Sequence, residues 1–352
     1  MNKLENKIPN NIIQSSKFSA LSDVIYSETV SMDDFSKIKS KYAEIIHKTN
    51  NENYKTVTYR LKKFRIAEND IIFCHLDSLP ELFFQLKKIT KLTNLILITN
   101  QTDQAIDISL YSQKPKCIKI WFSTNISFES NDLKPIPLGI ANNYAKKNLS
   151  LESFNYILKT RNKKISMYIN FRESTNYKER SKLIRKFQNY DWVNISKANL
   201  ENSDYHKDLT NNTFVLCPWG NGIDTHRFWE VLYSGSIPIT KYHPTYMTAD
   251  KLPVLFVESY SQINQNLLES FISKLDFTEQ EYKELDMIYW KNKVFKYKTG
   301  INTNEYVDLF ETKEETQLFE KNYIKRINMA KNKKKIKYYT DKIYKIPNKL
   351  FK

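Results

Sequence analysis

Short apolar runs recur along the chain, and polar or amphipathic segments separate them. Such runs are typical of buried strands, and the amphipathic segments between them are typical of helices. In the first half the runs are Ile71–Cys74, Leu95–Thr99, Ile118–Phe122 and Ile136–Gly139. In the second half they are Ile165–Ile169, Trp192–Ile195, Phe214–Cys217, Ile237–Ile239 and Leu252–Phe256. This alternation predicts an α/β fold with parallel sheets.

Amphipathic spacing predicts the helices and, with chain length, the domain organisation. We expect a short opening strand at Ile12 and Ile13. The expected helices cover residues 33–48, 81–89, 151–160, a segment starting at 177, and residues 205–212, 260–275 and 278–289. At 352 residues the chain exceeds one usual hydrophobic core, so we expect two Rossmann-type domains. The predicted parts are residues 1–145, residues 146–300 and a helical basic tail over residues 301–352, with residues 290–300 crossing back to the first domain.

One stretch, from Phe214 to Thr240, combines several structural signals. A buried strand is followed by a glycine-containing loop, and then by a helical pattern that Gly235 ends. Asp224 and Thr225 are of the residue types that begin helices. A second apolar strand follows at once. The stretch is therefore predicted to be a βαβ unit.

The helix of this unit carries groups that suit a nucleotide diphosphate. A helix N-terminus behind a glycine loop offers free N–H groups and a positive dipole end. Arg227 can contact a diphosphate with two hydrogen bonds, and Glu230, on the same helix face, can bind a ribose diol. The loop matches neither the P-loop nor the dinucleotide fingerprint, which disfavours ATPases and dehydrogenases. A plain βαβ unit with Arg227 and Glu230 paired on its surface is the alternative.

The same stretch resembles the nucleotide-sugar signature of exostosin-like glycosyltransferases. The resemblance is carried by Pro218-x-Gly220 and by Thr225-x-Arg227-x-x-Glu230-x-Leu232-x-x-Gly235-x-Ile237-Pro238. It implies a GT-B fold, with an acceptor domain over residues 1–145 and a nucleotide-sugar domain over residues 146–300. It also implies inverting transfer from a nucleotide diphosphate sugar to a glycan or glycolipid acceptor. We favour a UDP-sugar donor and a role in surface polysaccharide synthesis.

The expected donor site gathers residues from two post-strand loops and one helix start. Its members are Asn170, Arg172, Gly220, Asn221, Gly222, Asp224, Thr225, His226, Arg227 and Glu230. Inversion requires a general base for the acceptor proton. Polar residues after the strands of the first domain are the candidates, because open parallel sheets bind ligands at the carboxyl ends of their strands. The candidate bases are Asp77 and Asp103, then His75, with His226 as a further option; ordinary capping and turn roles are the alternative for each.

No metal and no cofactor are expected. Arg227 and the helix N-terminus can stabilise the leaving diphosphate, and no Asp-x-Asp motif lies in a suitable loop. The three cysteines, Cys74, Cys117 and Cys217, are widely spaced and form neither a disulfide framework nor a zinc site. Neither a secretory leader nor an apolar run of membrane-spanning length is evident. We therefore expect a cytoplasmic protein, either free or peripheral on the inner face of a membrane.

The C-terminal tail differs from the rest in charge. Residues 321–352 contain twelve Lys and Arg and one Asp, so they carry most of the formal net charge of +16. Isoleucines and tyrosines are interspersed among the lysines, a pattern typical of segments that dock on anionic membranes. A solvated basic tail is the alternative. Nucleic-acid binding is not expected, because no nucleic-acid-binding motif accompanies the charge.

Two other functions fit parts of the pattern. A GDP-fucose-dependent fucosyltransferase has a comparable helix, but it usually carries an acidic-aromatic-Asn segment where this chain has Pro218-Trp-Gly-Asn221. A non-catalytic glycan- or nucleotide-binding protein at the membrane surface is the alternative from a different class.

Overall fold

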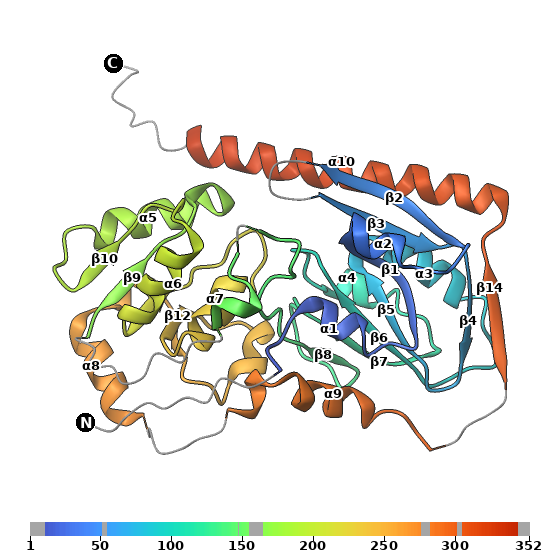
Figure 1. The fold of residues 1–352 in the computed structure, drawn as a ribbon, viewed down its shortest axis with the longest axis horizontal. Coiled ribbons are helices and arrows are strands. Elements are labelled where there is room, and N and C mark those ends of the chain that lie inside the picture. Colours follow the sequence, from blue (N-terminus) through green and yellow to red (C-terminus); the bar gives the residue numbers. More distant parts are fainter. Residues whose placement is uncertain are drawn as a thin grey trace.

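The computed structural model describes residues 11–50, 55–146, 148–154, 165–275, 282–300 and 305–343. Within these residues the protein is a mixed α/β structure with two main sheets, one built from the first part of the chain and one from the second. Figure 1 shows the two units beside each other, with one long helix running along both.

The first sheet has seven strands in the order β2-β3-β1-β5-β6-β7-β8. Five of them are parallel: β1 (Val24–Ser31), β5 (Ile71–His75), β6 (Leu95–Asn100), β7 (Ile118–Ser123) and β8 (Leu133–Pro135). At one edge, β2 (Ala43–Asn50) and β3 (Lys55–Leu61) add an antiparallel hairpin. A separate two-stranded ribbon pairs β4 (Lys63–Ala67) with β14 (Tyr306–Phe310).

Helices cover both faces of the first sheet. One face packs against α3 (Leu79–Leu86) around the buried ring of Trp121. The other packs against α1 (Ser15–Ser19) and against α9 (Met287–Phe295), whose Trp290 and Val294 are buried among the strand side chains. The expectation that residues 290–300 return to the first unit agrees with this packing. The short helices α2 (Met32–Ser36) and α4 (Ile108–Tyr111) lie at the periphery.

The second sheet has five strands, all parallel, in the order β10-β9-β11-β12-β13. They are β9 (Met167–Ile169), β10 (Val193–Ile195), β11 (Phe214–Leu216), β12 (Ile237–Lys241) and β13 (Leu255–Val257). On one face lie α6 (Asn202–Asn211) and α7 (His226–Tyr233), and on the other lie α5 (Tyr177–Phe187) and α8 (Gln265–Lys274). Because the strand order reverses between β9 and β11, a crevice for ligands is expected outside the carboxyl ends of these two strands.

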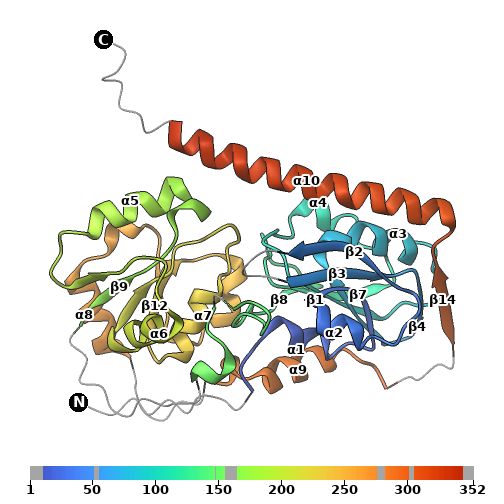
Figure 2. The same ribbon diagram turned by 45° about the horizontal axis from the view of Figure 1, so that its top comes forward.

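The last described helix, α10 (Lys313–Ile343), spans the molecule. It starts beside the first sheet and reaches α5 of the second unit, as Figures 1 and 2 both show. The 3-10 turns are η1 (Leu76–Ser78), η2 (Leu151–Phe154), η3 (Glu173–Thr175), η4 (Pro244–Ala249), η5 (Tyr260–Gln262) and η6 (Lys283–Leu285). None of the helices in the described ranges is both long and apolar enough to cross a membrane.

Three predicted elements are wrong. The helix over residues 33–48 ends at Ser36, and residues 43–50 form strand β2, because pairing with β3 outweighs the helical spacing. The run Ile136–Gly139 follows strand β8 instead of forming a strand. The helix predicted over residues 278–289 begins only at Met287, where Asp286 caps it; residues 276–281 are not described, nor are residues 155–160 of the helix predicted over 151–160.

The strand predicted at Ile12 and Ile13 is also wrong. Ile12 makes a single isolated bridge to Asp286 rather than a strand. The first strand among the described residues is β1, and the sequence pattern indicated neither it nor the hairpin partner β3. The predicted boundaries at residues 145 and 300 remain predictions. Both α9 and β14 come after the second sheet in the chain, yet they pack against the first unit.

Candidate ligand site at the seam of the two sheets

The two sheets meet through the loops at the carboxyl ends of their strands. Asn125, just after β7, accepts a hydrogen bond from the backbone N–H of Asp224, and the two atoms are 2.9 Å apart. Thr245 of η4 donates to the carbonyl of Ile126. We call this contact region the seam. It consists of Asp103, Asn125, Ile126, Leu138 and Gly139 on the first side and of Gly222, Asp224, His226 and Thr245 on the second.

The glycine loop after β11 leads directly to the start of α7. Its turn is closed by a hydrogen bond from the N–H of Gly220 to the carbonyl of Gly222, at 2.9 Å. Thr225 occupies the N-cap position with extended backbone, but its side chain makes no capping bond. Its Oγ1 is buried and has no hydrogen-bond partner among the described residues. The helix start therefore retains polar groups that a ligand can bind.

Gly222 allows the loop to approach the first unit closely. A Cβ atom at this position would lie 3.2 Å from the Cα of Asp103 and 3.3 Å from its carbonyl oxygen. Both are backbone atoms, which cannot move aside as a flexible side chain can. The glycine therefore brings Asp103, a predicted base, beside the loop that is predicted to hold the diphosphate.

Arg227 and Glu230 form the chemical centre of α7. Glu230 is 3% exposed; its Oε2 accepts a hydrogen bond from the Tyr205 hydroxyl at 3.0 Å. The Arg227 guanidinium lies 5.4 Å from the centre of the Tyr205 ring. Within the described ranges, Oε1 of Glu230 and Nη1 of Arg227 are buried and have no hydrogen-bond partner. Buried charged groups normally form hydrogen bonds, so this donor and this acceptor are available to a polar ligand.

Burial shifts the pKa values of the groups around Arg227. It raises the pKa of the Cys217 thiol to about 12, against the opposing charges of Arg227 and Arg180. It also raises the pKa of Tyr205 well above its ordinary value. Cys217 and Tyr205 are therefore neutral at physiological pH. Arg227 is left as a buried cation that can attract an anionic ligand.

Arg180 shapes the glycine loop instead of remaining free for a ligand. Its guanidinium donates to the carbonyls of Pro218 at 2.8 Å and Trp219 at 3.1 Å, and Asn176 also donates to Trp219. Burial and then the charge of Arg227 lower the pKa of Arg180 to about 10. These bonds join α5 and the residue before it to the loop after β11, across the reversal of strand order. The sequence pattern did not distinguish this role from a surface position.

Three predicted donor-site residues have structural partners. Asn170 is buried and donates to the carbonyl of Lys197 at 2.7 Å. Asp224 accepts hydrogen bonds from the Leu138 backbone N–H and the Trp229 indole. His226 is bonded through Nδ1 to the carbonyl of Gly139 at 2.8 Å. Because a carbonyl only accepts, Nδ1 donates in this bond, which leaves Nε2 as the ring nitrogen available to another group.

The other predicted site residues and candidate bases lie in different parts of the structure. Arg172 and Asn221 are exposed in their loops. Asp103 is exposed and forms an ion pair with Lys334 of α10 at 2.7 Å. His75 is buried, and Asp77 is half-buried beside α10, where its carbonyl accepts a hydrogen bond from Arg326. Burial lowers the pKa of His75. The structure thus brings Asp103 to the glycine loop, whereas His75 and Asp77 lie along the α10 side of the first sheet.

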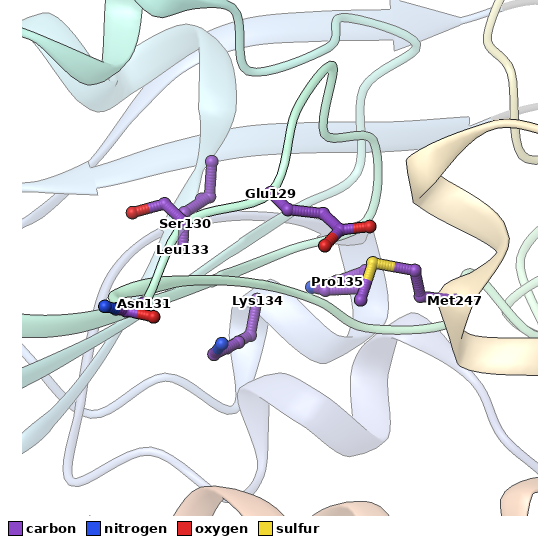
Figure 3. A pocket seen from close by; sticks show the side chains of 7 residues that line it. All are labelled: Glu129, Ser130, Asn131, Leu133, Lys134, Pro135 and Met247. Atoms are coloured by element: carbon purple, nitrogen blue, oxygen red, sulfur yellow. The ribbon is translucent and has the colours of Figure 1, made fainter.

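A small hollow lies elsewhere at the junction of the two units. It has a volume of about 180 Å³ and lies between the β8 segment and η4 (Figure 3). Its lining residues are Glu129, Ser130, Asn131, Leu133, Lys134, Pro135 and Met247. None of the predicted site residues lines it, so it contributes nothing to the site at α7. No group of three or more His, Cys, Asp or Glu among the described residues is placed to hold a metal ion.

Together, the fold and this site define a class: an α/β protein of two sheets with a candidate ligand site near the strand-order reversal of its second sheet. No protein-family model matches the chain, and no curated protein matches it. It is similar to a solved structure described as "Crystal structure of GtfA/B complex", with 11% sequence identity and a TM-score of 0.30. The match covers 76% of this chain and 58% of that chain. This identity and this TM-score are too low to support a conclusion about the chain. The resemblance to exostosin-like enzymes therefore depends on residues 218–238 alone.

Proposed function

We propose that the chain is a glycosyltransferase that uses a nucleotide diphosphate sugar as donor. One observation carries the proposal: Arg227 in the first turn of α7 and Glu230 one turn further along each have a buried polar atom without a partner among the described residues. A diphosphate and a ribose diol supply the complementary groups, an anion for the arginine and hydroxyl donors for the carboxylate.

The proposed donor contacts follow from the position of each group. The diphosphate binds Arg227, Oγ1 of Thr225 and the first N–H groups of α7, which the Gly220–Gly222 turn leaves accessible. Glu230 binds the ribose through Oε1, while its Oε2 stays with Tyr205. The carbonyl of Arg172 accepts a hydrogen bond from Arg180 at 3.1 Å, and its exposed side chain serves in this proposal as a second diphosphate contact.

The leaving nucleotide diphosphate gains negative charge in the transition state. Arg227 and the helix N-terminus stabilise that charge, as preorganised donors do in other transferases. The proposed reaction needs no metal ion for this step. Inversion at the anomeric carbon remains part of the proposal, since it comes from the family resemblance.

Asp103 is the proposed general base, with Nε2 of His226 as the second candidate. The backbone of Asp103 contacts the glycine loop, so its carboxylate lies near the place where the sugar would be held. Its partner Lys334 is exposed, so an acceptor can displace that ion pair at little cost. The acceptor, a glycan or glycolipid, would enter along the first-sheet side of the seam.

The first test is a thermal-shift panel with UDP, GDP, CDP, the matching nucleosides and inorganic phosphate. A ligand that binds only the folded protein raises the melting temperature according to its concentration and affinity. We expect UDP to stabilise the protein most and the nucleosides to have little effect. Stabilisation by GDP instead would favour the fucosyltransferase alternative.

The second test measures nucleotide release from UDP-sugars and GDP-sugars. Release that depends on protein concentration, and that increases with an added glycan, supports transfer. Binding of a nucleotide diphosphate without release from any donor would replace the transferase with a non-catalytic binding protein. If no nucleotide binds and none is released, the site at α7 is not a nucleotide site.

A further inference from the structure

Helix α10 has an inner face that packs on both units. Phe319 and Tyr323 are buried against the first unit, with exposed fractions of 4% and 1%. Further along, Arg326 donates to both carboxylate oxygens of Glu81 at 2.7 Å. The ring of Tyr338 then packs on Tyr177 of α5, with centroids 5.8 Å apart. Phe319, Tyr323 and Arg326 are spaced by four and three residues, so they share one face of the helix.

The opposite side of α10 exposes apolar side chains to solvent. Leu318 is 52% exposed, Met329 53%, Ile336 66% and Tyr339 52%. Leu318, Met329 and Ile336 are spaced by eleven and seven residues, so they form one line along the helix. Several apolar residues aligned on one exposed surface of a helix differ from single exposed ones and point to an interaction surface.

Lysines accompany this apolar line on the outer side. Lys321, Lys325 and Lys335 are exposed there, and no described acidic residue forms a salt bridge with them. From residue 321 to residue 343 the helix carries nine Lys and Arg against one Asp. A partner for this face must therefore be apolar at its surface and strongly negative. An anionic lipid bilayer has both properties over the whole length of the helix.

We propose that the outer face of α10 docks the protein on an anionic membrane surface. The helix lies flat on the bilayer, with Leu318, Met329 and Ile336 in the headgroup region and the lysines among anionic lipids. Because α10 runs along both units on one side of the molecule (Figure 2), the body of the protein stays on one side of the bilayer. This inference does not depend on the proposed function.

The test uses full-length protein and sedimentation with phosphatidylcholine vesicles, with or without phosphatidylglycerol. A variant with Lys321→Glu, Lys325→Glu and Lys335→Glu removes the outer charge. The matched control changes three exposed lysines away from α10, Lys251→Glu, Lys291→Glu and Lys296→Glu, and alters the net charge equally. A third variant, with Leu318, Met329 and Ile336 each changed to Ser, tests the apolar contribution. Thermal melting confirms that every variant is folded.

We expect wild type and the matched control to bind anionic vesicles and not neutral ones. The outer-charge variant should bind at least about tenfold more weakly, and added salt should weaken wild-type binding. The serine variant should also lose affinity. The proposal is overturned if wild type does not bind anionic vesicles, or if the outer-charge variant and its control bind alike. Binding to duplex DNA with the same dependence on Lys321, Lys325 and Lys335, and no vesicle binding, would assign the face to nucleic acid instead.

Discussion

At the residue scale, Arg227 is a charged side chain whose buried Nη1 has no hydrogen-bond partner among the described residues. Its guanidinium is held beside Tyr205, and the surrounding ionisable groups Tyr205 and Cys217 are neutral. No other arginine in the described ranges occupies the start of α7. Arg180 is fully engaged by loop carbonyls, so it cannot replace Arg227.

We predict that Arg227→Ala lowers the rate of nucleotide release by about two to three orders of magnitude, because it removes charge stabilisation from the leaving group. The measurement is the initial rate of release from the best donor. Arg185→Ala is the control, since Arg185 is exposed on α5 and bonds only within its own helix. Wild-type activity in Arg227→Ala with normal melting would place the site elsewhere.

The contribution of Asp224 to the free energy of unfolding depends on pH. Burial raises the pKa of this carboxyl to about 7, against the hydrogen bonds from Leu138 and Trp229 that lower it. The raised pKa means that the folded state binds more protons than the unfolded chain between about pH 4 and pH 7. The stabilising contribution of Asp224 to the free energy of unfolding is therefore largest at low pH and decreases as the pH rises towards 7.

We predict that Asp224→Asn flattens the dependence of melting temperature on pH between about pH 4 and 7. The contribution of Asp224 over that window is at most about 4 kcal/mol. Glu28 in the first unit has a pKa raised to about 7 by burial and acts in the same direction, so Glu28→Gln is measured in parallel. An unchanged profile in Asp224→Asn would show that the seam carboxyl does not titrate in this range.

At the element scale, one of the ion pairs that attach α10 to the first unit involves a buried carboxylate. Glu81 of α3 has a side chain that is 2% exposed, and Arg326 is its ion-pair partner. The second ion pair to the first unit in this part of the helix, Lys334–Asp103, is about half exposed on both sides. Two ion pairs on one helix thus differ mainly in burial.

We predict that Arg326→Ala destabilises the protein by about 2 kcal/mol or more, because it leaves a buried charge without its partner. Lys334→Ala should change the free energy of unfolding by less than about 1 kcal/mol, since exposed pairs contribute little. Urea titration of both variants measures the difference. Equal effects would mean that Glu81 finds another partner or becomes protonated when Arg326 is removed.

The sequence predicted the buried parallel strands well and the edge elements poorly. Strands β5, β6 and β7 are nearly continuous apolar runs, because both faces of a parallel sheet are covered by helices. Strands β2 and β3 carry polar residues between apolar ones and depend on each other for pairing. Their pattern is locally ambiguous, so the segment 43–48 was predicted to be a helix.

At the scale of the whole molecule, the seam joins the two halves of the candidate site. The glycine loop contacts Asp103 across it, and Asp224 and His226 bind the backbone of Leu138 and Gly139. Helix α10 also contacts both units. A ligand that orders the glycine loop should therefore affect the first unit as well.

We predict that a bound nucleotide diphosphate slows amide hydrogen exchange in two separate segments, residues 217–227 and residues 101–104. The first contains the proposed phosphate contacts, and the second adjoins Gly222 across the seam. Exchange measured by mass spectrometry with UDP or GDP tests this, and the matching nucleoside is the control. Protection limited to residues 217–227 would mean that the first unit takes no part in donor binding.

The sequence by itself determined the buried strands, the βαβ unit around the glycine loop, and the presence of Arg227 and Glu230 one helical turn apart. These depend on local spacing, which the order of residues specifies directly. Only the tertiary structure decided that Arg180 holds the glycine loop, that Asp224 and His226 bind the first unit, and that helix α10 packs along both units. Those roles depend on contacts between residues that are distant in the chain and come together only when the two sheets meet. Local spacing in the sequence does not predict such contacts.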